Sequence, residues 1–297
     1  MPSSNSLRVL IVGCGYVGRA LGAELVRQGC RVSGLRRAQH ADAELRDLGI
    51  QPIIADLTRP ASLPPLGSGY DWVVLCVSAS GGGPAEYREV YFEGTRRLLS
   101  WLASAPPRKL VYTSSTAVYG QLDGSEVNES SPASPQTDTG RVLLETEQVL
   151  LQAASEQNTV VLRVAGIYGP GRSYWLDQVR AGTARIDERG ERFLNMIHQA
   201  DLVGAIHASL VRGKPGEIYN AVDHEPVPQR TLLDWLAGQL GLPVPQSASP
   251  GQHELSKRRL TSKRVSNRKL THDLDYRFRF PTFREGYAEL FGAERSG

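Results

Sequence analysis

The chain has 297 residues and 40% of them are apolar, which is enough to bury a substantial core. No stretch approaches the ~18 consecutive apolar residues that a membrane span needs, and the first apolar run is too short for a secretory signal. Three cysteines at unrelated spacings, Cys14, Cys30 and Cys76, are typical of a reducing compartment, so we expect a cytoplasmic protein without a disulfide framework.

The net charge of +3 comes from one segment near the C-terminus. Residues 251–270 hold seven basic side chains and one acidic one, whereas the rest of the chain has 27 basic and 30 acidic side chains. The segment has no aromatic side chains between its charges, so it is not typical of nucleic-acid binding. A solvated surface and a site for a phosphorylated small ligand both remain open.

Short apolar runs alternate with helical patterns over the first 165 residues. Continuous apolarity, bounded by glycine, proline or polar residues, is typical of strands that are buried on both faces. Such runs predict strands at 7–12, 31–35, 52–55, 72–77, 110–113 and 159–162. Amphipathic periodicity predicts a first helix that Gly29 ends, and two more at 86–102 and 141–153. This alternation predicts an α/β fold with a doubly wound parallel Rossmann sheet of about seven strands.

The pattern changes after residue 165, where prolines and glycines cluster. Helical patterns at 201–211, 231–240 and 283–290 alternate there with short strands such as 217–221. We expect residues 1–165 to form a Rossmann domain. Residues 166–297 should form mainly a smaller C-terminal substrate-binding lobe. Some segments of each range are expected to belong to the other part.

A glycine-rich turn, Gly13-Cys14-Gly15-Tyr16-Val17-Gly18, follows the first predicted strand and opens the first predicted helix. One glycine permits the tight turn, one lets the backbone approach a pyrophosphate, and one lets the helix pack on the strand. The helix N-terminus then offers free N–H groups to the phosphates. The motif predicts dinucleotide binding by Gly13, Gly15, Tyr16, Val17 and Gly18. A glycine-rich turn with a purely structural role is the alternative.

The end of the second predicted strand indicates which dinucleotide is bound. An NAD site places an acidic residue there to bind the ribose 2′-hydroxyl, whereas this strand runs into Arg36 and Arg37, with no acid before Asp42. Two guanidinium groups suit a 2′-phosphate. We therefore expect NADP(H) to be preferred, with NAD(H) and solvated strand-end charges as the alternatives.

Several motifs together resemble the extended short-chain dehydrogenase/reductase superfamily, in its NAD-dependent epimerase/dehydratase group. Beyond the glycine turn they are Asp56-Leu57, Glu93-Gly94-Thr95, the run YTSSTAVYG at 112–120, residues 162–171, Ile197-His198 with Asp201-Leu202, and Tyr219-Asn220. The resemblance implies that Ser115 is the catalytic serine. It also implies that Asp56 and Leu57 lie on the adenine side of the cofactor and that Val77 and Ser78 contact it.

The Tyr-x-x-x-Lys pair of that superfamily has no counterpart in this sequence. The register places Thr139 at the tyrosine and Leu143 at the lysine, and neither side chain can transfer a proton near neutral pH. In this the chain is similar to the atypical members, above all the YeeZ-like subgroup. Tyr119 and Tyr168 are candidates for the missing phenol. No cluster of residues has metal-ligand spacing, so we expect no metal.

These observations favour an NADP(H)-dependent oxidoreductase or epimerase-like enzyme that acts on an unidentified small molecule. A non-enzymatic NADP(H) sensor and a protein scaffold are the alternatives. The resemblance implies that the basic segment borders the substrate lobe, so one of Arg258, Arg264 or Arg268 is expected to bind an anionic substrate group. It also implies a homodimer through the helices at 86–102 and 141–153.

Overall fold

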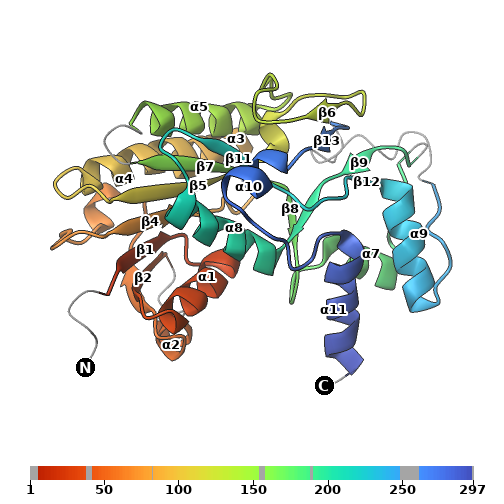
Figure 1. Ribbon diagram of the computed structural model, residues 1–297, viewed down its shortest axis with the longest axis horizontal. Helices are drawn as coiled ribbons and strands as arrows, with labels where there is room; N and C mark the ends of the chain where they lie inside the picture. Colours follow the sequence, from red (N-terminus) through yellow and green to blue (C-terminus); the bar gives the residue numbers. More distant parts are fainter. Residues whose placement is uncertain are drawn as a thin grey trace.

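The computed structural model describes residues 6–37, 42–81, 83–153, 158–187, 190–247 and 261–295. Seven parallel strands form the central sheet in the order β11-β7-β5-β4-β1-β2-β3 (Figure 1). They are β1 (Arg8–Val12), β2 (Arg31–Arg36), β3 (Gln51–Ile54), β4 (Trp72–Leu75), β5 (Lys109–Ser115), β7 (Thr159–Val164) and β11 (Ile218–Ala221). The prediction of a doubly wound parallel sheet is confirmed.

Helices cover both faces of this sheet, because its strands present apolar side chains on both sides. Val9 and Ile11 of β1 pack with α1 (Tyr16–Arg27) and α8 (Gln199–Arg212). Leu10 and Val12 face the opposite layer, which contains α4 (Gly94–Leu102) and α5 (Asp138–Gln152). The short helix α2 (Asp42–Asp47) lies between β2 and β3 in the chain.

The helix expected at 86–102 differs from its prediction. It begins earlier, as α3 (Gly83–Tyr87), and continues through a π-helical segment, η3 (Arg88–Glu93), before α4. A π-helical turn has i→i+5 hydrogen bonds and shifts the helix face. Apolar periodicity cannot reveal such a local shift, because the apolar residues still fall on the buried side.

A smaller lobe is built around a second apolar core. Its strands pair in two short ladders, and three helices surround them. The strands are β8 (Gly166–Tyr168) with β10 (Met196–His198), and β9 (Phe193–Leu194) with β12 (Val227–Pro228). The helices are α7 (Tyr174–Arg180), α9 (Gln229–Leu240) and α11 (Phe283–Arg295).

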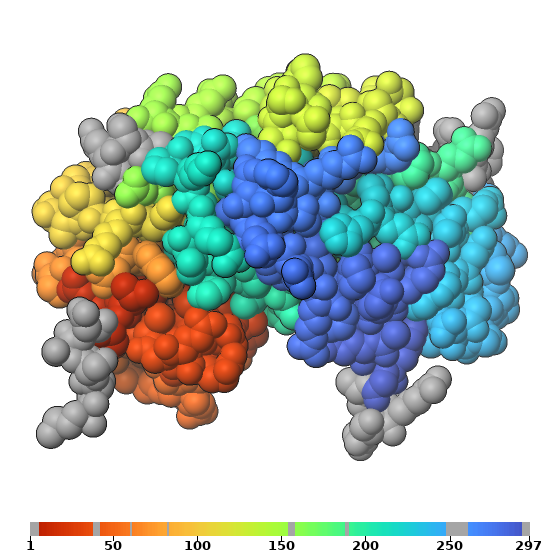
Figure 2. Space-filling model, viewed as in Figure 1, coloured from red at the N-terminus to blue at the C-terminus, as the bar shows by residue number. Residues whose placement is uncertain are grey.

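Residues after 165 also contribute to the large sheet. The strand β11 pairs with β7, and α8 packs on one face of this sheet. The segment after residue 261 then joins the two parts. It contains β13 (Arg264–Val265), which pairs with β6 (Glu126–Val127), and α10 (Arg268–Asp273). Figure 2 shows this segment, in dark blue, crossing one face of the molecule toward α9. Among the described residues, no helix has the length and apolarity that a membrane span requires.

Candidate dinucleotide and substrate site

The glycine turn lies where the strand order reverses, between β1 and β4. A Cβ on Gly13 would come within 2.6 Å of the carbonyl oxygen of Cys76, and the φ of Gly13 is +90°. A Cβ on Gly18 would lie 2.9 Å from the carbonyl oxygen of Gly13, so α1 packs directly on the turn. A Cβ on Gly15 would make only an ordinary contact, 3.9 Å from the carbonyl oxygen of Gly13. The three glycines therefore fit a tight turn, a helix contact and a backbone surface that a pyrophosphate can approach.

The N-terminus of α1 opens directly from this turn. Its first turn contains no acidic residue and no side chain caps it, so its N–H groups remain available to an anion. Tyr16 fastens the turn to the rest of the molecule, because Gln199 Nε2 donates to its carbonyl oxygen at 2.8 Å and Arg172 lies over its ring. Burial raises the pKa of the Tyr16 phenol to about 12.

Three arginines gather at the end of β2 beside the turn. Arg36 Nη1 lies 3.4 Å from Glu44 Oε2, and Arg19 of α1 forms an ion pair with the same carboxylate. Arg37 is exposed and donates to Ser80 Oγ at 3.1 Å. The sequence reasoning found Arg36 and Arg37 but missed Arg19 and Glu44. A signal for Arg19 was its position directly after Gly18, at the start of the helix.

The loops after β3 and β4 supply the other residues expected to contact the cofactor. Asp56 Oδ1 accepts hydrogen bonds from the backbone and hydroxyl of Thr58, which orders this loop. Leu57 is buried in the apolar cluster on the α4 side of the sheet. A Cβ on Gly13 would also lie 2.7 Å from the Cα of Val77, so the chain entering Ser78 runs directly beside the glycine turn.

Ser115 ends β5, paired with Val164 of β7. Its hydroxyl accepts a hydrogen bond from Ala117 N at 3.1 Å and caps a short 3₁₀ helix, and the residue is only partly buried. Carboxyl ends of parallel strands are where ligands bind in such sheets. The position of Ser115 is therefore suited to contact with a substrate.

Thr139 and Leu143 lie on α5, near its start. Thr139 Oγ1 is 3.1 Å from the hydroxyl of Thr137, the residue that caps the helix. Leu143 is 5% exposed and belongs to a buried cluster with Val118 and Ala165. Leu143 is therefore packed against its neighbours, at the position where the resemblance implies a lysine.

The two tyrosines proposed as replacement proton donors are buried in packed surroundings. The Tyr119 hydroxyl donates to Asn220 Oδ1 at 3.0 Å and accepts from Arg163 Nη1 at 2.9 Å, and burial raises its pKa. Tyr168 is 3% exposed and stacks on Tyr287 in the core of the small lobe, where burial raises its pKa. The Tyr119 phenol is therefore held by hydrogen bonds and the Tyr168 ring by packing, and their role in proton transfer stays a prediction.

The arginines of the basic segment point outward where they are described. Arg264 is exposed, donates to the carbonyl oxygen of Gly124 and lies over the ring of Phe193. Arg268 is exposed beside Glu126, 3.9 Å away. Arg258 lies outside the described residues. The expectation that one of these arginines binds an anionic substrate group stays a prediction. Lys263, by contrast, is buried.

Known proteins are similar to this chain in sequence and in fold. Protein YeeZ of Escherichia coli strain K12 is 30% identical over 92% of this chain and 96% of its own length. A 4-hydroxy-2-methyl-3-oxo-4-farnesyl-3,4-dihydroquinoline-1-oxide ketoreductase of Stigmatella aurantiaca is 28% identical over 77% of this chain and 72% of its own. A solved structure of a functionally unknown conserved protein from Silicibacter pomeroyi is 29% identical, with a TM-score of 0.81, over 97% of this chain and 99% of that one.

The resemblance that the sequence motifs indicate is thereby confirmed over nearly the whole length of the chain. The model of the NAD dependent epimerase/dehydratase family matches residues 9–221, which include the glycine turn, Ser115 and all seven strands of the large sheet except the first residue of β1. The chain belongs to the NAD-dependent epimerase/dehydratase family.

Proposed function

We propose that the protein is an NADP(H)-dependent oxidoreductase that acts on a small molecule without a Tyr-x-x-x-Lys pair. The observation that carries the cofactor assignment is the group of three arginines, Arg19, Arg36 and Arg37, beside the glycine turn at the end of β2. Arg19 and Arg36 share one carboxylate, that of Glu44, and Arg37 donates to the uncharged Ser80, so the corner keeps a positive charge that suits a 2′-phosphate.

The residues present fit a nicotinamide dinucleotide. Gly13 permits the tight turn, Gly15 leaves the backbone open to a pyrophosphate, and Gly18 lets α1 pack on the turn. The uncapped N-terminus of α1 adds free N–H donors. Asp56 and Leu57 border the adenine end, and Val77 and Ser78 border the turn from the side of β4. The cofactor, when bound, supplies or accepts a hydride.

Ser115 is the residue that we assign to the reacting oxygen of the substrate. It lies at the carboxyl end of β5, is partly accessible, and its hydroxyl hydrogen is free to be donated while its oxygen accepts from Ala117 N. The proton that the reacting oxygen takes up must come from water or from a group other than Thr139 and Leu143, since Thr139 cannot ionise near neutral pH. The ketoreductase relative supports a reductase over a purely binding role.

A non-enzymatic NADP(H) sensor is the second candidate. It is favoured by the burial of Tyr119 and Tyr168, which removes both proposed phenols from the cleft. Hydride transfer from NADPH to carbonyl compounds, followed as loss of absorbance at 340 nm, separates the two. Turnover that falls in Ser115→Ala supports the enzyme, and NADPH binding without turnover on a broad carbonyl panel supports the sensor.

Calorimetry of the full chain with NADPH and NADH tests the cofactor assignment. We expect NADPH to bind at least tenfold more tightly, which corresponds to about 1.4 kcal/mol. The double variant Arg36→Ala/Arg37→Ala should lose that preference, while NADH binding stays nearly unchanged. Arg31→Ala, at the opposite end of β2, is the matched control. Equal affinities in the parent protein contradict the assignment.

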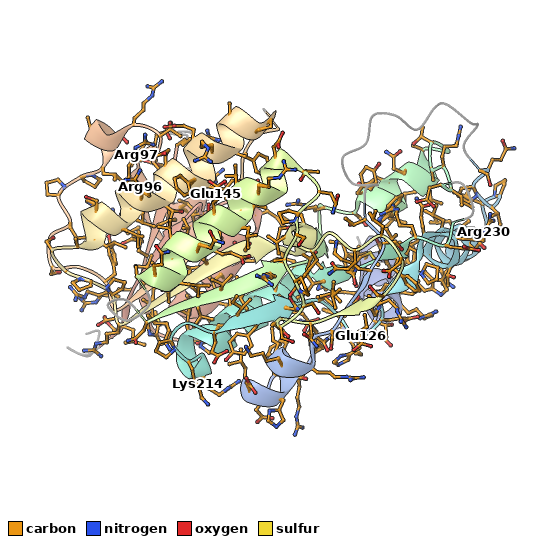
Figure 3. The ribbon with its side chains drawn as sticks, turned by 90° about the horizontal axis from the view of Figure 1, so that it is seen from above. Arg96, Arg97, Glu126, Glu145, Lys214 and Arg230 are labelled. Atoms are coloured by element: carbon orange, nitrogen blue, oxygen red, sulfur yellow. The ribbon has the colours of Figure 1, made fainter. Side chains whose placement is uncertain are left out.

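We also propose a homodimer and a cytoplasmic location. The dimer would form through the helical layer that contains α4 and α5, where Figure 3 shows Arg96, Arg97 and Glu145. Light scattering of the full chain tests it, with a monomer as the contradicting result. The cytoplasmic location is supported by the three cysteines, all of which are free thiols.

A further inference from the structure

Lys263 is a buried cation that forms no ion pair with the residues that the structure describes. Its side chain is 5% exposed, and its ammonium group donates to Thr261 Oγ1 at 2.8 Å. An ammonium has three N–H donors, so two of them are without an acceptor among the described residues. Burial of a charge is costly unless it is paired and hydrogen-bonded, and such positions are often retained for a function.

The charged group that acts on Lys263 among the described residues is itself a cation, Arg192. Burial and, to a lesser extent, the charge of Arg192 lower the pKa of Lys263 to about 8. The acid of this neighbourhood, Asp187, accepts a hydrogen bond from Arg192 Nε at 2.6 Å. Asp187 is thus engaged by Arg192, and no ion pair joins Lys263 to a carboxylate of the described residues.

The backbone around Lys263 is held from both parts of the molecule. Ser262 N donates to the carbonyl oxygen of Gln121 at 3.0 Å, in the loop that follows Ser115. On the other side, Asn195 Nδ2 donates to the carbonyl oxygen of Lys263 at 3.0 Å, and Val265 N donates to Asn195 Oδ1 at 2.8 Å. Asn195 lies between β9 and β10 of the small lobe. Lys263 is therefore fixed between the two parts of the molecule.

Alternation along this extended segment decides which way the side chains face. Arg264 is exposed, whereas Lys263 and Val265 are buried. Val265 packs in the cluster that contains Val118 and Ala165, which follow the ends of β5 and β7. Lys263 thus lies on the inner face of the segment, toward the edge of the sheet where Ser115 ends β5.

We propose that Lys263 binds an anionic oxygen of the substrate, in a carboxylate or phosphate group, at the junction of the two parts beside the Ser115 edge. An anion there would accept the two unused N–H donors and supply the missing negative charge. The flexible stem of the lysine lets the ammonium turn from Thr261 toward such a group. This inference rests on the proposed function, because it names the class of substrate for the same cleft.

Anion binding to the NADPH-saturated full chain tests the inference. Saturation with NADPH fills the phosphate-binding positions of the cofactor, so further stabilisation reports a second site. Inorganic phosphate and malonate, each at constant ionic strength set with KCl, should raise the melting temperature of the parent protein and of Lys263→Arg. The stronger of the two effects distinguishes a phosphate from a carboxylate substrate. Lys263→Met should weaken the binding at least tenfold, whereas the outward neighbours in Arg264→Gln and Arg268→Gln should leave it unchanged.

Chemical labelling of lysines reports anion binding at Lys263 directly. The chain has only five lysines, so each can be followed separately. Acetic anhydride labelling with mass spectrometry reports each one separately. The more effective anion should reduce acetylation of Lys263 at least fivefold and leave the exposed Lys214 unchanged. Equal labelling of Lys263 with and without anion overturns the inference, as does equal anion stabilisation of the parent protein and Lys263→Met. NADPH binding by Lys263→Met confirms its folding, and failure of the parent protein to bind NADPH would instead overturn the proposed function.

Discussion

Arg36 of β2 places a guanidinium nitrogen 3.4 Å from a carboxylate oxygen of Glu44, on the helix that follows. Arg19 pairs with the same carboxylate from α1. The acid that the sequence does not show at the end of β2 is therefore supplied nearby from α2, where it meets two cations. Its position raises the question of whether Glu44 binds a ribose hydroxyl or only orders the arginines.

Replacement of Glu44 by glutamine answers this question. If the corner binds a 2′-phosphate, removal of the negative charge should tighten NADPH binding by up to about fivefold, equivalent to about 1 kcal/mol. NADH binding should stay within about twofold. Calorimetry of both cofactors measures the change, with Glu24→Gln on the exposed part of α1 as control. A loss of NADH affinity in Glu44→Gln would show that Glu44 holds the 2′-hydroxyl.

The lost catalytic pair yields a prediction about turnover. General acid–base catalysis contributes about 10²–10⁴-fold to a rate, so we expect negligible epimerase or dehydrogenase turnover on ordinary nucleotide sugars even with NADP(H) bound. Steady-state assays of the parent protein and of Ser115→Ala measure this. Robust activity on a nucleotide sugar that survives Ser115→Ala would show that the active site lies elsewhere.

Restoration of the lysine is expected to destabilise the fold. Leu143 is packed in a buried cluster, so the ammonium of Leu143→Lys would have to leave water for apolar surroundings. We expect a loss of unfolding free energy on the order of 3 kcal/mol. Gln148→Lys, exposed on the same helix, should change it by less than about 0.5 kcal/mol. Urea unfolding measures both, and an unchanged stability of Leu143→Lys would show that the position opens to solvent.

Glu147 and Glu145 of α5 provide a matched pair of ion-pair deletions. Glu147 is 1% exposed, binds Arg163 at 2.7 Å and accepts from Ser114 Oγ. Glu147→Gln leaves the buried Arg163 without its counter-charge and should cost about 3–5 kcal/mol. Glu145 pairs with Arg88 at the surface, so Glu145→Gln should cost less than about 1 kcal/mol. Similar losses in urea unfolding would mean that the buried pair adds no more than the surface one.

The large sheet could be predicted because its strands are buried on both faces, and such strands are short continuous apolar runs in the sequence. The position of the glycine turn followed from the same pattern, since a turn after β1 must lie at the carboxyl edge of a parallel sheet. The inclusion of β11 in that sheet could not be predicted. It depends on pairing with β7, more than fifty residues earlier in the chain.

The surroundings of the site residues were harder to predict than their positions. Tyr119 was identified by its motif, but its burial depends on Arg163 and Asn220, which come from other strands. Within the basic segment, no apolar alternation marks the buried face. The contrast between an inward Lys263 and an outward Arg264 therefore becomes visible only through the contacts with Gln121 and Asn195.

Lys263 should make the stability of the protein depend on pH in a specific direction. Its pKa is 10.5 in an unfolded chain and about 8 in the folded one. Between these values the unfolded chain holds a proton that the folded chain has released, so the stability contributed by this residue rises with pH and is lowest below pH 8. Lys263→Met removes the buried charge. It should therefore be more stable than the parent protein at pH 7, by up to about 3 kcal/mol, and this advantage should shrink toward pH 10.

Urea unfolding of the parent protein and of Lys263→Met at pH 7 and pH 10 measures this difference in stability. Groups that titrate in the same way in both proteins do not contribute to it. Lys214→Met, at an exposed lysine, should show no such pH dependence. A difference between the parent protein and Lys263→Met that is the same at both pH values would contradict the depressed pKa. A stabilised variant that loses anion binding would show that the buried ammonium is retained at a cost in stability for the sake of its ligand.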